Sequence, residues 1–85
     1  MVSETVKINI PGEIERKAAL LVQTASSFDS RIHISYLNKS INAKSIMGVM
    51  TLPLSDGDEV TITAEGADEN KAMKEMAEFF TGAID

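Results

Sequence analysis

Apolar and polar residues alternate along this chain in two periods, one typical of strands and the other of helices. Residues 6–10 read Val-Lys-Ile-Asn-Ile, an every-second-residue pattern that predicts a strand with one buried face. The same period recurs over residues 32–36 and 60–64 and predicts two further strands. A short apolar stretch at residues 41–43, after a tight turn, predicts another. The chain therefore supplies four strands.

Three other segments carry helical spacing. The first covers residues 17–28, and its apolar stripe is formed by Ala18, Leu21, Val22, Ala25 and Phe28, with Leu20 at its edge. The last is expected to begin after Asp68, whose side chain can cap a helix N-terminus, and its stripe is formed by Ala72, Met73, Met76 and Phe80. Between them, a short helix is expected from Ser45, as its N-cap, to residue 51 or 52.

These elements follow the order βαββαβα, and each strand has one apolar face. This pattern favours an α/β fold of the α+β type, an open-faced sandwich in which helices cover one face of a four-stranded antiparallel sheet and water covers the other. The chain has 85 residues with no linker or internal repeat, so we expect a single domain over residues 1–85.

Composition narrows the class of protein. The chain has no cysteine, which excludes disulfides, thiolate metal sites and a cysteine nucleophile, and which fits the reducing cytoplasm. Its 13 acidic and 8 basic residues give a net charge of −5, a poor basis for binding nucleic acid. The N-terminus lacks the features of a signal peptide, and no apolar run is long enough to span a bilayer. We expect a cytoplasmic protein with no nucleic-acid or membrane partner.

Candidate catalytic and metal sites are few. The single histidine, His33, lies between Ile32 and Ile34, so strand alternation places it on the solvent face, and no positioned acid–base partner stands near it in the sequence. We interpret it as a surface residue. Several acidic residues do not follow the calcium-loop pattern, so a solvated surface is favoured over a metal site: Glu13, Glu15, Asp56, Asp58, Glu59, Asp68 and Glu69. No cofactor or metal site is expected.

The short helix concentrates flexible apolar side chains behind a serine. Met47 and Met50 lie three residues apart, on roughly one face, where a core role and a partner-binding role are both open. Met73 and Met76, in contrast, fit the buried stripe of the last helix. Taken alone, Ser45 is an ordinary helix cap.

The chain as a whole resembles the HPr family, the small histidine-containing phosphocarriers of the bacterial sugar phosphotransferase system. The resemblance rests on the element order, on residues 18–23, Ala-Ala-Leu-Leu-Val-Gln, and above all on residues 42–50, Asn-Ala-Lys-Ser-Ile-Met-Gly-Val-Met. It covers essentially the whole chain and implies the HPr fold.

One motif departs from the family pattern. HPr proteins carry Gly-Leu-His-Ala-Arg-Pro-Ala-Ala, whereas residues 12–19 here read Gly-Glu-Ile-Glu-Arg-Lys-Ala-Ala. The phosphoacceptor histidine is thus replaced by Ile14, which has no nitrogen lone pair with which to attack a phosphoryl group. This chain is similar in kind to the HPr-like paralogue Crh, which also lacks the histidine and has glutamine in its place.

The resemblance implies a regulatory role instead of an enzymatic one. It implies that Ser45 is phosphorylated by HPr kinase/phosphorylase and that the phosphorylated form binds a LacI-type regulator of carbon catabolite control. Arg16, Ile46, Met47 and Met50 match the family's partner-contacting positions, and an Enzyme I surface without phosphoryl transfer is a further partner. The alternatives are an HPr-type phosphocarrier, and an inactive or redesigned scaffold.

Overall fold

The computed structural model of the chain describes residues 1–9, 14–51 and 57–81. Its elements follow the expected βαββαβα order: β1 (Val2–Lys7), α1 (Ile14–Ser26), β2 (Arg31–Tyr36), β3 (Lys39–Asn42), α2 (Ile46–Met50), β4 (Glu59–Glu65) and α3 (Glu69–Thr81).

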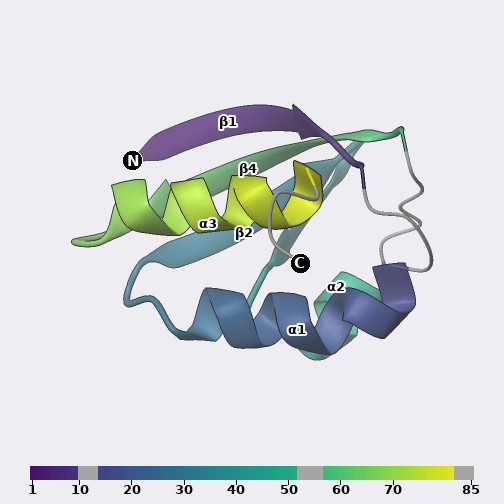
Figure 1. The fold of residues 1–85 in the computed structure, drawn as a ribbon, viewed down its shortest axis with the longest axis horizontal. Helices are drawn as coiled ribbons and strands as arrows, with labels where there is room; N and C mark the ends of the chain where they lie inside the picture. The colour runs from purple at the N-terminus through teal and green to yellow at the C-terminus, as the bar shows by residue number, and fades with distance from the viewer. Residues whose placement is uncertain (10–13, 52–56, 82–85) are drawn as a thin grey trace.

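The four strands form one antiparallel sheet in the order β1-β4-β2-β3 (Figure 1). In the centre of the sheet Ile34 of β2 pairs with Ile62 of β4, and Val6 of β1 pairs with Val60 of β4. Because side chains alternate along a strand, these pairs set all the inward residues on one face. The predicted open-faced sandwich is confirmed.

The core lies between this face and the helices. The fully buried side chains of greatest volume come from both layers, namely Phe80, Leu21, Ile32, Ile34, Ile62, Met76 and Val60. Phe79 and Phe80 meet edge to face, with ring centroids 5.7 Å apart. Met73 and Met76 are buried, as the helical stripe predicted.

The opposite face of the sheet is polar and open to solvent. His33 is exposed there, between Thr63 of β4 and Asn42 of β3, as the alternation predicted. Beside it, the hydroxyls of Thr5 and Thr61 are hydrogen-bonded across β1 and β4 at 2.9 Å. Small polar side chains therefore occupy the centre of this face.

The first strand was placed wrongly by the sequence pattern. It was expected at residues 6–10, but β1 ends at Lys7, and residues 10–13 lie outside the described part. Ile8, just after the strand, is buried. Its N–H donates to the carbonyl of Asp58 at 2.7 Å, and its carbonyl accepts the N–H of Gly57 at 2.8 Å. The earlier residues form a strand because β4 pairs with all of them, from Val2 to Lys7.

Other boundaries shift by a few residues. The first helix begins at Ile14, earlier than predicted, and ends at Ser26, so the buried Phe28 belongs to the following turn. The third strand is β3 (Lys39–Asn42) instead of residues 41–43. Ala43, fully buried just after it, still donates its N–H to the carbonyl of Ile32 at 2.9 Å.

Asp68 has a different role from the predicted helix cap. It precedes α3, and its carbonyl accepts the N–H of Ala72 at 2.9 Å, but its carboxylate turns to the loop after α1. There it accepts the N–H groups of Asp29 and Ser30, each at 2.9 Å, and the Ser30 hydroxyl. The Ser30 hydroxyl, followed by the backbone N–H of Asp29, holds the pKa of Asp68 below its usual range. The carboxylate thus ties α3 to the start of β2.

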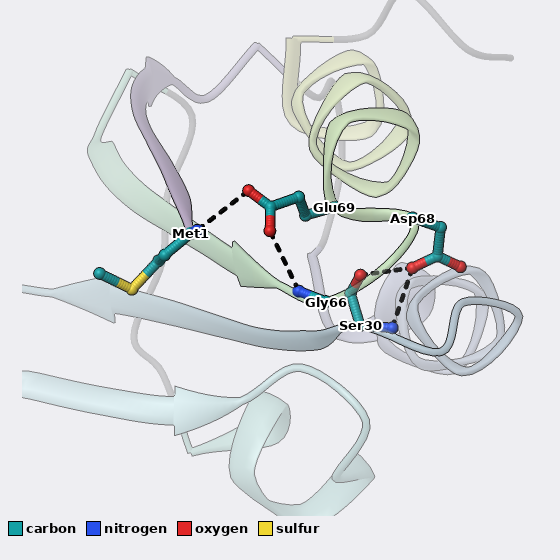
Figure 2. A network of polar contacts seen from close by, with 5 residues as sticks. All are labelled: Met1, Ser30, Gly66, Asp68 and Glu69. Carbon is teal, nitrogen blue, oxygen red and sulfur yellow. Dashed lines mark hydrogen bonds and ion pairs between the residues drawn. The ribbon is translucent and has the colours of Figure 1, made fainter.

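The neighbouring Glu69 ties the same end of α3 to β1 and β4 (Figure 2). One of its carboxylate oxygens lies 3.0 Å from the Met1 ammonium, and the other accepts the N–H of Gly66 at 3.2 Å. The ammonium and the Gly66 N–H both lower the pKa of Glu69.

Candidate functional site

Ser45 is the N-cap of α2, as predicted. Its backbone is extended, with φ −103° and ψ 112°, and its hydroxyl oxygen accepts the N–H of Gly48 at 3.2 Å. Its carbonyl accepts the N–H of Val49 at 3.0 Å, the first bond of the helix. Ser45 is exposed, and in the described part of the chain its hydroxyl makes no other hydrogen bond. The hydroxyl proton is therefore open to an external base.

The segment before Ser45 is held firmly. The Asn42 carbonyl accepts the N–H of Ser45 at 3.0 Å, and the Asn42 side chain accepts the N–H of Lys44 at 2.8 Å. The Lys44 ammonium donates to the carbonyl of Phe28 at 2.7 Å, in the turn after α1. These bonds fix the position of the serine relative to α1.

The apolar side chains that follow are mostly exposed. Met47 is 78% exposed, Met50 58% and Ile46 41%, whereas Val49 is 3% exposed and anchors α2 in the core. The open choice between core and surface for the two methionines is thus decided, since both lie on the surface. We call Ile46, Met47 and Met50 the α2 patch.

Leu20 on α1 is a further exposed apolar residue, 47% exposed. The helix α1 packs against α2, which also contacts β3. The sequence placed Leu20 at the edge of the α1 stripe but did not connect it with Met47 or Met50. Its exposure could have been inferred from the sequence, because Leu20 lies outside the apolar stripe that already supplies the buried face of α1.

The altered first motif, residues 12–19, runs into α1, which begins at Ile14. Glu13 lies outside the described residues, and Ile14 and Arg16 are described only through their backbone in the first turn of α1. The structure therefore brings together Ser45 and the α2 patch, while the role of Arg16 remains a prediction.

In residues 1–9, 14–51 and 57–81, no three acidic or histidine side chains are grouped so that they could hold a metal ion. None of the helices in these ranges is long and apolar enough to cross a membrane.

Comparison with known proteins gives this surface its context. Residues 2–82 match the family model described as the phosphorylation site of the HPr component of the phosphotransferase system. This chain belongs to the HPr family. HPr itself, after which the family is named, is a phosphocarrier and not an enzyme.

Solved HPr-family structures are similar over nearly the whole chain. The phosphocarrier HPr of Bacillus anthracis is 39% identical, with a TM-score of 0.89, and the match covers 93% of this chain and 95% of that one. HPr from Thermoanaerobacter tengcongensis is 44% identical, with a TM-score of 0.86 and coverage of 96% and 97%. The Bacillus subtilis catabolite repression protein Crh is 39% identical, with a TM-score of 0.79 and coverage of 100% and 99%. The chain thus has both HPr and Crh proteins as structural neighbours.

Proposed function

We propose that this chain is a regulatory HPr-family protein of the cytoplasm, switched by phosphorylation of Ser45. HPr kinase/phosphorylase adds the phosphate from ATP, and the phosphorylated form binds a LacI-type regulator in carbon catabolite control. The observation that carries this proposal is the position of Ser45, exposed at the start of α2 beside the exposed α2 patch.

Phosphorylation of Ser45 changes the surface more than the fold. A phosphate adds close to two negative charges at about neutral pH, and the amide end of a helix favours negative charge. Ser45 lies outside the core, whereas Val49 holds α2 in place. The modified protein therefore keeps the α2 patch where it was and presents a new anion beside it.

The first motif argues against a phosphohistidine relay. Ile14 stands where the family carries its phosphoacceptor histidine and offers no nucleophilic nitrogen at any pH. The chain's one histidine, His33, lies on the open face of the sheet, away from the helix layer. Crh, the catabolite repression HPr of Bacillus subtilis, is a structural neighbour of this chain and supports a regulatory role.

The α2 patch is the part of this surface that recognises both partners. Methionine side chains are long, unbranched and polarizable, so they adapt to more than one apolar surface. Met47 and Met50 provide this adaptability on α2, and Leu20 is a further exposed apolar residue on the neighbouring helix α1. Arg16 is included as a partner-contacting residue on the family motif alone.

Two parallel reactions test the proposal. Incubation with HPr kinase/phosphorylase and ATP is expected to add one phosphate, detected by intact-protein mass spectrometry, and Ser45→Ala is expected to abolish it. Incubation with Enzyme I and phosphoenolpyruvate is expected to add none. Failure of the wild-type chain to gain phosphate in the first reaction, or transfer in the second, would contradict the proposal.

A further inference from the structure

Gly48 is the third residue of α2 and stands against the Ser45 hydroxyl. A Cβ added to Gly48 would lie 3.4 Å from Ser45 Oγ, 3.5 Å from Ser45 Cβ and 3.5 Å from Ile41 Cβ. Gly48 is not among the glycines with a positive φ, which in the described residues are Gly57 and Gly66. The backbone conformation of Gly48 is therefore open to any residue.

Glycine has a low helix propensity, which makes it an unfavourable residue at this position. In a helix interior it is about 1 kcal/mol less favourable than alanine. A methyl group at 3.4 to 3.5 Å from its neighbours would make ordinary van der Waals contacts, so the unmodified protein has room for alanine. Two of the three nearest atoms that a side chain at position 48 would meet belong to the Ser45 side chain.

Phosphoryl transfer to Ser45 needs more space than the hydroxyl itself. The serine oxygen and the leaving oxygen lie roughly in line through the phosphorus, whose three other oxygens spread around the equator. A methyl group already in contact with Ser45 Oγ would occupy part of the space that these equatorial oxygens need. It would also restrict the rotation with which Ser45 turns toward the kinase.

We propose that Gly48 is a positioning residue for phosphorylation of Ser45, because its missing side chain keeps the space around the serine oxygen open. This inference rests on the proposed function. In the reaction, Ser45 Oγ forms a bond to the γ-phosphorus of ATP while the bond from that phosphorus to the bridging β–γ oxygen breaks. ADP leaves, and the serine proton passes to a base of the kinase.

Gly48→Ala tests the inference, with Asn70→Ala as the control. Asn70 is exposed on α3, so its replacement also favours a helix but adds nothing near Ser45. With HPr kinase/phosphorylase and ATP, we expect Gly48→Ala to lower kcat by about tenfold, since small misplacements of reacting groups are costly. Its KM should stay near that of the wild type, because the α2 patch is unchanged. Asn70→Ala should match the wild type in both constants.

Thermal unfolding separates steric hindrance from loss of structure. Gly48→Ala is expected to unfold at or above the wild-type temperature, and Gly48→Ser, whose Cβ takes the same place, should repeat the fall in kcat. Phosphorylation of both variants at the wild-type rate would overturn the inference and leave the proposed function standing. Absence of phosphate on the wild-type chain would overturn both.

Discussion

One exposed and one buried methionine allow the same substitution to be compared on the surface and in the core. Met47 is 78% exposed on α2, whereas Met76 is fully buried under the sheet. Truncation of a buried methionine to alanine costs about 2–5 kcal/mol of the free energy of unfolding, because it removes apolar contacts and leaves a cavity. An exposed position away from special features usually changes that energy by less than about 0.5 kcal/mol. We therefore expect Met76→Ala to destabilise the fold and Met47→Ala to leave it nearly unchanged.

Binding should show the reverse order. Interface residues whose truncation matters cost more than about 1 kcal/mol, which is roughly a fivefold loss of affinity. Met47→Ala is expected to weaken binding of the serine-phosphorylated protein to the regulator by at least that factor. Urea unfolding and calorimetric titration measure the two effects. An equal loss of stability in Met47→Ala and Met76→Ala, or binding of Met47→Ala to the regulator with wild-type affinity, would refute these expectations.

Three further predictions concern the stability of the fold. Ser45→Ala should lower the free energy of unfolding by about 1 kcal/mol through loss of the α2 cap, whereas Ser45→Asp should retain most of it in the same urea titration. Because the folded pKa of Asp68 and of Glu69 is lowered, their stabilisation is complete above the ordinary carboxyl range and is lost as the pH falls below about 4. Asp68→Asn should flatten this acid limb of the stability profile, and an unchanged limb would exclude Asp68 as its cause. Gly66→Ala should destabilise the chain by about 1–3 kcal/mol in thermal unfolding, since its Cβ would lie 2.7 Å from Ser30 Cα, while an unchanged transition would argue against that contact.

The strands could be predicted from the sequence where one face of the strand is buried, because apolar and polar residues then alternate. Residues of β2 and β4 such as Ile34 and Ile62 are fully buried partners, so the period was clear. The start of β1 was missed because Ser3, Glu4 and Thr5 are exposed on an edge strand. Their strand conformation comes from pairing with β4, which no local pattern reveals.

Long-range polar contacts were a second feature that the sequence did not predict. Asp68 was recognised as a residue that precedes a helix, but its carboxylate bonds Asp29 and Ser30, which lie 39 and 38 residues away in the chain. A capping preference depends on neighbouring residues only, and it cannot show that a folded loop offers better donors.

The candidate site, too, could be predicted only in part. Ser45 as an N-cap followed from its residue type and position. Whether Met47 and Met50 are buried could not be decided by spacing, because α2 is short and Val49 alone supplies its anchor. The proximity of α1, which carries Leu20, is a product of packing.

We propose that the phosphate on Ser45 switches the chain into its regulator-binding form. The most direct test is a calorimetric titration of the LacI-type regulator with wild-type protein before and after phosphorylation by HPr kinase/phosphorylase, with Ser45→Ala carried through the same treatment. The phosphorylated wild type is expected to bind, whereas the unmodified protein and Ser45→Ala are expected not to bind. Equal binding with and without the phosphate, or no binding by the phosphorylated chain, would contradict it.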